Sequence, residues 1–308
     1  METRKIGSLT VSVTGLGCNN FGWRLDYDHT VAVVDAALDA GINFFDTADI
    51  YGPLQSEEYL GRALQGRRDK VVLATKFGMK VDDERQGAKP DYVRRACEDS
   101  LRRLRTDHID LYQLHRPDPE TPIADTLGAL GALVRAGKVR EIGCSQFSVE
   151  QIREAKTAAG DGARFVSVQN EFSLLHREPE QGVLAECKRE GMAFLPFFPL
   201  AGGMLTGKYR VGEPVPENTR LSKGNERFLN DRNLGIVEEL VQFAAFRGHS
   251  LLELAFSWLL SHPEVASVIA GATHAEQIQG NVKAGGWHLD HAELAEIDKL
   301  APMAAPKP

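Results

Sequence analysis

Ionisable side chains close several short apolar runs in this chain, and together they suggest one kind of chemistry. Asp46 ends the run Ile42–Phe45, and the phenol Tyr51 follows five positions later. Lys76 and His115 end two later runs in the same way. An Asp–Lys ion pair kept out of water would place a positive charge near Tyr51 and lower a pKa that starts at about 10. Such a tyrosine can act as general acid near neutral pH, with His115 donating a hydrogen bond to a carbonyl oxygen.

Motifs for other reaction types are not found in the sequence. It contains no Gly-x-Ser-x-Gly and no histidine placed to activate a cysteine. A carboxylate pair for glycoside hydrolysis is also missing, because Asp49 is expected to point along its loop rather than across a cleft. No His-x-His or carboxylate-rich strand end favours a metal-dependent barrel hydrolase, and no metal site is predicted. A site that protonates without a nucleophile needs a cofactor that delivers something else, such as a hydride.

Composition is that of a globular protein with a large core: 308 residues, 43% hydrophobic and 26% charged. The formal charge of −7 argues against a nucleic-acid or anionic-membrane partner. No signal peptide follows Met1–Lys5, and the apolar run Ala193–Met204 is broken by prolines and glycines, so a cytoplasmic location is expected. The cysteines have no metal-binding spacing and are interpreted as reduced thiols. They are Cys18, Cys97, Cys144 and Cys187.

Short apolar runs alternate with amphipathic segments along the chain. The runs predicted as strands are Thr14–Cys18, Ile42–Asp46, Lys70–Lys76, Ile109–His115, Val139–Ser145, Phe165–Asn170, Met192–Phe198 and Ala266–Ala270. Helices are predicted from Asp28 to before Gly41, over Glu57–Leu64, from Pro90 through Leu104, from Pro122 to before Gly137, after Ser148, over Glu178–Glu190, Leu234–Phe246 and Leu251–Leu260, from Ala275, and over Ala292–Leu300. Asp28 and Thr121 are expected to cap their helices, and Ser148 with Gln151 fits a capping box.

Eight strands alternating with helices, without a linker, predict an α/β fold of the (β/α)8 TIM barrel type. Residues 6–13 suggest an N-terminal β-hairpin, and 202–233 form a long loop after strand 7. We expect a single domain over 1–308. The alternative, an open dinucleotide-binding sheet, is disfavoured because Gly15-Leu16-Gly17 lacks the third glycine of that fingerprint.

In such a barrel the active site lies at the carboxyl ends of the strands. The predicted strands end in Asp46, Lys76, His115, Ser145, Gln169-Asn170 and Phe197-Phe198. Each of these side chains alone has an ordinary explanation, such as a solvated lysine or a turn histidine. Their recurrence at one rim favours a shared site.

Several stretches resemble the aldo-keto reductases, particularly bacterial members, and they occur in the order found in that family. They are residues 41–52 (GINFFDTADIYG), 56–61 (SEEYLG), 73–76 (LATK), 111–117 (LYQLHRP) and 137–143 (GKVREIG). The resemblance extends from the hairpin to about Asn281. It implies a catalytic tetrad of Asp46, Tyr51, Lys76 and His115. The implied activity is reversible NAD(P)H-dependent reduction of an aldehyde or ketone.

The resemblance also implies a nicotinamide cofactor bound in extended form without a Rossmann fold. Ser145 and Gln169 would hold the carboxamide, and Phe197 would stack on the nicotinamide ring; core packing is the alternative for Phe197. Gln146 stands where the family usually has asparagine. The full set of expected cofactor-binding residues is Gly17, Cys18, Ser145, Gln146, Gln169, Phe197, Pro199, Leu200, Lys208, Arg220, Gly271, Thr273, Gln277 and Asn281.

Cofactor preference and substrate are less constrained. Arg220 favours NADP(H), since an arginine fork suits a 2′-phosphate, but residues 270–277 offer no basic residue beyond His274, so NAD(H) stays open. Trp23 is expected either to line the substrate pocket or to pack beneath the first loop. No Lys/Arg cluster indicates a substrate phosphate or carboxylate, so the expected partner is a small carbonyl compound or its alcohol.

A nucleotide-sensing regulatory subunit of a membrane channel, similar to these reductases but with little turnover, is the alternative function. Such a subunit can keep the whole tetrad, so the tetrad does not decide between the two. The chain begins at the hairpin, which is expected to leave no added segment for reaching a channel. The enzyme is therefore favoured, with its oligomeric state open.

Overall fold

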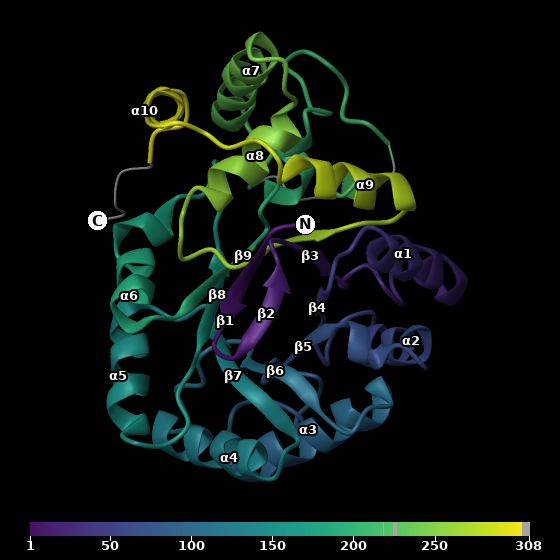
Figure 1. Ribbon diagram of the computed structural model, residues 1–308, viewed down its shortest axis with the longest axis vertical. Coiled ribbons are helices and arrows are strands. Elements are labelled where there is room, and N and C mark those ends of the chain that lie inside the picture. The colour runs from purple at the N-terminus through teal and green to yellow at the C-terminus, as the bar shows by residue number, and fades with distance from the viewer. Residues whose placement is uncertain (218, 224–226, 304–308) are drawn as a thin grey trace.

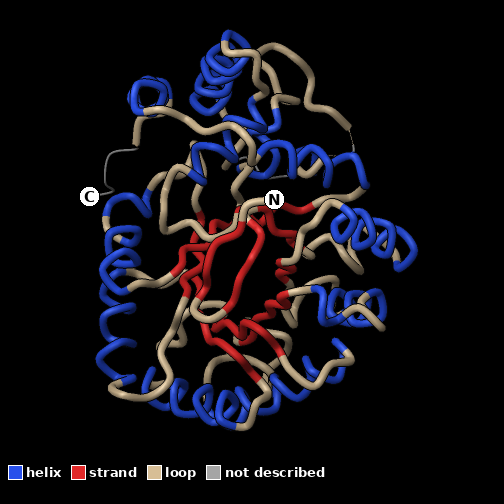
Figure 2. The backbone as a smooth tube through the Cα atoms, viewed as in Figure 1, coloured by secondary structure: helices blue, strands red, loops and turns tan. Residues whose placement is uncertain are grey.

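Eight parallel strands form a ring surrounded by helices in the computed structural model, which describes residues 1–217, 219–223 and 227–303 (Figures 1 and 2). The strands are β3 (Thr14–Gly17), β4 (Phe44–Asp46), β5 (Val72–Phe77), β6 (Ile109–Leu114), β7 (Val139–Ser145), β8 (Ser167–Glu171), β9 (Ala193–Phe197) and β10 (Val268–Gly271). From β4 to β9 each strand pairs with its predecessor in the chain, and β10 pairs with β3.

The ring closes between β9 and β10 without a regular ladder. The backbone amide of Ala266 donates to the carbonyl of Phe194 at 3.0 Å, and the amide of Phe194 donates to the carbonyl of Glu264 at 2.7 Å. These bonds precede β10, so the closing strands stay adjacent although β10 is short. The predicted (β/α)8 barrel is confirmed.

The helices lie outside the ring, and most of them bury an apolar face against it (Figure 2). They are α1 (Tyr27–Asp39), α2 (Gln55–Ala63), α3 (Pro90–Leu104), α4 (Ile123–Arg135), α5 (Val149–Ala159), α6 (Val183–Glu190), α7 (Asp231–Phe246), α8 (Leu251–Leu260), α9 (Ala275–Ala284) and α10 (His291–Leu300). Helices α7 and α10 lie beyond this layer, at the edge of the molecule (Figure 1).

The N-terminal hairpin of β1 (Thr3–Ile6) and β2 (Leu9–Ser12) covers one mouth of the ring (Figure 1). Ile6, Leu9 and Val11 are buried in a cluster with Phe44 and Leu111, whose side chains fill the barrel interior. Since β6 begins two residues before Leu111, this mouth is the amino-terminal end of the strands. The hairpin therefore closes the barrel floor and leaves the carboxyl ends open.

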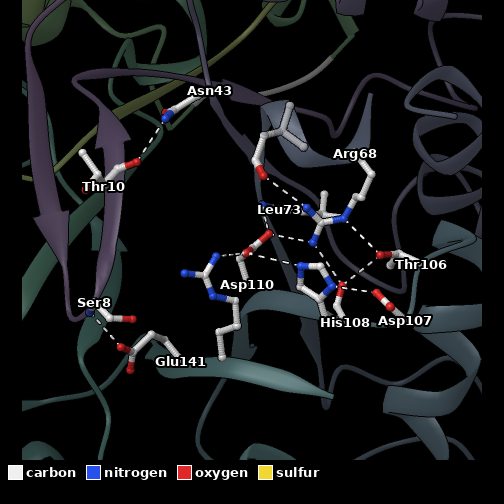
Figure 3. A network of polar contacts seen from close by, with 12 residues as sticks. Ser8, Thr10, Asn43, Arg68, Leu73, Thr106, Asp107, His108, Asp110 and Glu141 are labelled. Atoms are coloured by element: carbon white, nitrogen blue, oxygen red, sulfur yellow. Dashed lines mark hydrogen bonds and ion pairs between the residues drawn. The ribbon is translucent and has the colours of Figure 1, made fainter. Parts of the chain in front are cut away.

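A polar network lies at the same end of the barrel (Figure 3). The carboxylate of Asp110, at the start of β6, accepts hydrogen bonds from Arg68 at 2.6 Å, from the Leu73 amide at 2.9 Å and from Arg140 at 2.7 Å. The tip of the hairpin is tied down nearby, where the Ser8 amide donates to Glu141 at 2.7 Å. Both oxygens of the buried Asp110 carboxylate are bonded, so the network ties β5, β6 and β7 together.

Two predicted helix caps are wrong. Asp26, not Asp28, caps α1, because its carboxylate accepts the His29 amide at 3.0 Å, whereas Asp28 lies inside the first turn. Thr121 does not cap α4, because its hydroxyl donates to Asp118 at 2.8 Å. The capping box of Ser148 is present as predicted.

Several predicted boundaries also differ. β5 begins at Val72 rather than Lys70, because Arg68 bonds the Val71 carbonyl and closes a short 3₁₀ turn there. The predicted helix over 178–190 is a 3₁₀ turn, Glu178–Gln181, followed by α6. The loop after β9 contains two 3₁₀ segments, Ala201–Thr206 and Leu221–Lys223, while its residues 218 and 224–226 lie outside the described part of the chain.

Candidate active site

The buried ion pair expected from the sequence lies at the carboxyl end of the barrel. Lys76, near the end of β5, donates to the Asp46 carboxylate at the end of β4 at 2.6 Å, and their side chains are 0% and 6% exposed. A second bond from Lys76 to the Thr47 carbonyl, at 2.8 Å, fixes the ammonium. Burial alone would lower the pKa of Lys76, but Asp46 and Tyr51 outweigh it and raise the pKa above its ordinary value. Lys76 is therefore a permanent positive charge.

Asp46 is held by neighbours from across the barrel. Its second carboxylate oxygen accepts from the side-chain amides of Gln113 at 3.1 Å and Gln169 at 3.2 Å. Gln169 comes from β8, on the far side of the strand ring from β4. The ion pair thus has a fixed position, with amides satisfying the oxygen that Lys76 does not reach.

Tyr51 lies on the loop after β4, with the Lys76 ammonium 5.2 Å from its ring centroid. The pKa of Tyr51 is raised above its ordinary value of 10.0, because burial outweighs the opposing effect of the Lys76 charge. The sequence-based expectation of a lowered pKa is therefore wrong for this state of the protein. Its physical cause is desolvation, which a sequence does not reveal. Tyr51 carries its proton at neutral pH, as a general acid must.

His115 stands edge-on to Tyr51, with ring centroids 5.9 Å apart and planes at 82°. It follows β6 directly, and its amide donates to the Phe77 carbonyl at 2.8 Å. Burial, reinforced by Lys76 and Arg116, lowers the pKa of His115 to about 3. Its Nδ1 is buried without a hydrogen-bond partner among the described residues. A neutral imidazole therefore stands ready to bond a polar ligand beside the phenol.

A cavity of about 790 Å³ opens over these side chains. Asp46, Tyr51 and His115 line it, while Lys76 lies beneath its surface. All of the residues predicted to bind a cofactor line it as well: Gly17, Cys18, Ser145, Gln146, Gln169, Phe197, Pro199, Leu200, Lys208, Arg220, Gly271, Thr273, Gln277 and Asn281. The structure therefore brings together side chains from the strand ends, the long loop after β9 and the start of α9.

The cavity fits an extended dinucleotide in size and in the chemistry of its wall. Its volume lies within the range of cofactor sites. Phe197 is half-buried and lines the cavity, so it does not only pack in the core. Its aromatic ring is available for stacking against a ligand. Lys208 supplies a cation, and the wall includes the glycines Gly17 and Gly271.

Three predicted side chains behave differently from expectation. The Ser145 hydroxyl donates to the Gln169 carbonyl at 2.8 Å and is already engaged. Gln146 has φ of +61° and donates to the His115 carbonyl at 3.1 Å. Trp23 is 62% exposed, so packing beneath the first loop is wrong. It is not among the residues that line the cavity, and its place in the substrate pocket stays a prediction. Its neighbour Arg24 lines the cavity instead.

Of two arginines in the cavity wall, sequence reasoning predicted Arg220 and missed Arg24. Arg24, from the loop after β3, and Arg220, from the loop after β9, line the same cavity as Tyr51. Only folding brings these two loops together, so sequence spacing gave no signal. Lining residues outside the expected cofactor-binding set are Asn19, Asn20, Phe198, Gly202, Gly203, Thr206, Thr219, Leu252, Ile269, Ala270, His274, Glu276 and Gly280.

Asp49, on the same loop as Tyr51, is buried and does not line the cavity. Its amide donates to the Lys76 carbonyl at 3.1 Å, while its Oδ1 has no partner among the described residues. Burial and the neighbouring Glu57 raise its pKa to about 7, although Arg103 and Lys76 oppose them. As expected, it is not positioned to act across a cleft.

Cysteine and metal chemistry have little support in the described residues. All four cysteines are buried free thiols, and burial raises the pKa of Cys18 well above its ordinary value. No three His, Cys, Asp or Glu side chains of the described part converge as metal ligands would. Across the same residues, no helix has the length and apolar character needed to cross a bilayer.

Comparison with known proteins agrees with this geometry. The model of the Aldo/keto reductase family matches residues 14–302. A probable aldo-keto reductase 1 from Glycine max is 36% identical over 304 residues, which cover 95% of this chain and 86% of that protein. The structure is similar to that of a glycerol dehydrogenase from Gluconobacter oxydans, with a TM-score of 0.86 and 31% identity over 99% of this chain and 98% of the other. The chain belongs to the aldo/keto reductase family of oxidoreductases.

Proposed function

We propose that the protein reversibly reduces an aldehyde or ketone to an alcohol, using a nicotinamide dinucleotide. The observation that carries the proposal is a protonated Tyr51 beside a neutral His115, backed by the buried Lys76–Asp46 pair at the base of a cavity. Membership of an oxidoreductase family supports the same reaction class. The glycerol dehydrogenase named among the similar structures makes alcohol oxidation the second direction to assay.

Proton transfer belongs to Tyr51. In reduction its hydroxyl gives a proton to the carbonyl oxygen, and the phenolate that forms is stabilised by the Lys76 ammonium. In oxidation the phenolate takes the proton of the alcohol. Asp46 keeps Lys76 in place through one carboxylate oxygen. The other oxygen of Asp46 accepts hydrogen bonds from two side-chain amides. Asp46 is thus a positioning residue.

His115 would bond the substrate oxygen and hold it beside Tyr51. Its pKa of about 3 keeps it neutral over the physiological range, so it orients the substrate without competing as an acid. The dinucleotide, when bound, supplies a hydride to the carbonyl carbon or accepts one from the alcohol. The residues proposed to hold it are those of the cavity wall, with Phe197 against the nicotinamide ring, Thr273 just before α9, and Gln277 and Asn281 on α9.

For the cofactor we favour NADP(H) over NAD(H) because Lys208 lines the cavity and can meet a phosphate. The start of α9 offers only Thr273, His274, Glu276 and Gln277, so the preference rests on the loop after β9. Titrating the protein with NADPH and NADH by fluorescence tests it. We expect tighter NADPH binding, and Lys208→Met should weaken NADPH more than NADH. Equal affinities in the native protein would contradict the preference.

Tyr51→Phe is the decisive test of the reaction. Loss of the hydroxyl removes the acid, and turnover should fall by about 10²–10⁴-fold while NADPH affinity is retained. A panel of aldehydes with NADPH consumption as readout also separates an enzyme from a nucleotide-binding regulatory subunit. Full turnover by Tyr51→Phe with intact cofactor binding would refute the role of Tyr51.

A further inference from the structure

Two buried carboxylates, Asp49 and Glu57, are close enough to interact electrostatically. Asp49 is on the loop of residues 47–54 that joins β4 to α2 and carries Tyr51, called the catalytic loop below, and Glu57 is in the first turn of α2. The two residues are 3% and 0% exposed. A buried carboxylate is stable as an anion only when cations or hydrogen-bond donors compensate its charge. The partners of each carboxylate therefore decide which one keeps a proton.

Glu57 is fully compensated. The guanidinium of Arg103, on α3, donates to one oxygen of Glu57 at 2.7 Å, and the Thr75 hydroxyl donates to the other at 2.6 Å. The close approach of α2 and α3 fixes this arrangement, since a Cβ on Gly61 would lie 2.7 Å from the Arg103 carbonyl oxygen. Glu57 is therefore held as an anion.

Asp49 has no comparable partner. Its Oδ1 is buried without a hydrogen-bond partner among the described residues, which also place no cation within ion-pair distance of it. Burial and the charge of Glu57 raise the pKa of Asp49 to about 7, although Arg103, the Ile50 amide and Lys76 oppose them. The two carboxylates thus share one nearby arginine, and their cluster is neutral only while Asp49 holds a proton.

The other charged and titratable groups around Asp49 do not supply the missing charge. The two cations that act on it, Lys76 and Arg103, are each bonded to a different carboxylate. Tyr92 on α3 and Tyr112 on β6 also lie within its electrostatic reach, and burial raises the pKa of both phenols, so both stay neutral at physiological pH. Ionised Asp49 is therefore an unpaired charge in a buried place.

The backbone of Asp49 connects the ion pair of the site to Tyr51. The Asp49 amide donates to the Lys76 carbonyl at 3.1 Å, and the Lys76 ammonium donates to the Thr47 carbonyl at 2.8 Å. The Tyr51 amide in turn donates to the Ala48 carbonyl at 3.2 Å. These bonds set the place of the phenol relative to the ammonium. An Asp49 carboxylate that moves toward water would pull on this backbone two residues before Tyr51.

We propose that Asp49 is a positioning residue whose proton keeps the catalytic loop in place. Protonated Asp49 holds Tyr51 beside Lys76, and ionised Asp49 moves toward water and displaces Tyr51. The proton is exchanged with solvent and takes no part in the reaction. The inference rests on the proposed carbonyl reduction, because it specifies how pH regulates the acid of that reaction. Reduction should be fast below about pH 7 and slow above it.

The pH dependence of kcat tests the proposal, with saturating NADPH and the aldehyde that is reduced fastest in the panel. In the native protein we expect kcat to fall by about 10-fold or more between about pH 6 and about pH 8.5. Asp49→Asn cannot ionise, so its kcat should change by less than about twofold over the same range. A fall of native size in Asp49→Asn would overturn the proposal and assign the pH dependence to another group, such as Tyr51.

Two neighbouring glutamates of α2 provide a matched pair of variants. Glu57→Gln removes the negative charge that acts on Asp49, so the midpoint of the fall in kcat should move to lower pH by about one unit or more. Glu58 is exposed, and Glu58→Gln should leave the midpoint unchanged. A purely structural role for Asp49 would not produce such a shift. A midpoint that stays in place in folded Glu57→Gln, as judged by circular dichroism, would contradict the proposal.

Hydrogen–deuterium exchange of residues 47–54 follows the catalytic loop without turnover. After correction for the intrinsic rate, exchange in the native protein should be about 10-fold faster or more at about pH 8.5 than at about pH 6. Asp49→Asn should show no such difference, and the hairpin, residues 3–12, is the internal control. This difference in a protein that reduces no aldehyde would refute the reduction but keep the role of Asp49. Turnover with exchange unaffected by pH would keep the reduction and refute that role.

Discussion

Two buried aspartates, Asp46 and Asp110, stand at opposite ends of the barrel, and each is fully hydrogen-bonded. At the amino-terminal end, Asp110 accepts from two arginines and one backbone amide (Figure 3). At the carboxyl end, Asp46 accepts from one lysine and two side-chain amides. By hydrogen bonding alone the two sites look equally structural.

The difference lies in what the cations face. Arg68 and Arg140 are partly exposed, and both form ion pairs with Asp110. Lys76 is fully buried, and beyond Asp46 its charge reaches the ring of Tyr51 beneath an open cavity. A buried ion pair therefore indicates function when its cation also acts on a third group that a ligand can reach. Otherwise it indicates stability.

Lys76→Met should have the largest effect of any change that probes this comparison. It removes the charge that stabilises the Tyr51 phenolate, so turnover should fall by about 10²–10⁴-fold. Arg68→Met, which removes a cation of the other network, is the matched control and should keep turnover within about twofold. The measurement is steady-state NADPH consumption with folding checked by circular dichroism. Similar losses in both variants would break the distinction.

Asp110→Asn tests the structural end. Its arginines would lose their counter-charge, and removing one partner of a buried pair costs about 3–5 kcal/mol. We expect the free energy of unfolding, measured by urea denaturation, to fall by about 3 kcal/mol, with turnover retained in the folded protein. Arg140→Met should cost less, because Arg140 is half exposed. A variant of unchanged stability would contradict the assigned role.

Local sequence patterns are sufficient to predict the barrel and the rim on which its ionisable residues meet. Short apolar runs that end in polar residues mark strand ends, and parallel strands place those ends on one rim. Asp46, Lys76 and His115 are therefore expected as neighbours from the sequence pattern alone. The observed strand order and the Lys76–Asp46 ion pair agree with that expectation.

Properties that depend on folded surroundings were not predictable. The pKa of Tyr51 rises because desolvation outweighs Lys76, and a sequence gives the charges without the burial. The helix cap at Asp26 rather than Asp28 depends on which carboxylate reaches the His29 amide. The proximity of Arg24 and Arg220 arises from two loops that are distant in the chain. Long-range proximity is thus the missing information.

Asp49→Asn extends the comparison to another buried carboxylate, which bonds no cation among the described residues. Its pKa of about 7 lies above the ordinary 3.8, so the folded state binds a proton that the unfolded chain has lost. Stability should therefore decline as pH rises from about 4 to 7. The neutral amide removes this effect and should raise the free energy of unfolding by about 4 kcal/mol at about pH 8, with little change at about pH 4.

The measurement is urea denaturation of both proteins across that range. The charges of Glu57, Arg103 and Lys76 also act on the pKa of Asp49. Glu57→Gln is therefore the companion variant. With Asp49 retained, it should lower the pKa of Asp49 and make the loss of stability with rising pH less steep. A difference between Asp49→Asn and the native protein that stays constant with pH would show that Asp49 is ionised throughout. Asp49 would then match the two paired aspartates.

Glu141→Ala is the smallest change and tests how far the structural end extends. Its carboxylate accepts the Ser8 amide at 2.7 Å and holds the tip of the hairpin that closes the barrel floor (Figure 3). Because this contact is exposed, its loss should cost only about 0.5–1 kcal/mol. Turnover and NADPH affinity should not change, since the hairpin and the cavity occupy opposite mouths. A drop in turnover without a stability loss would mean that the floor and the catalytic rim are coupled, and the two ends would no longer be separable.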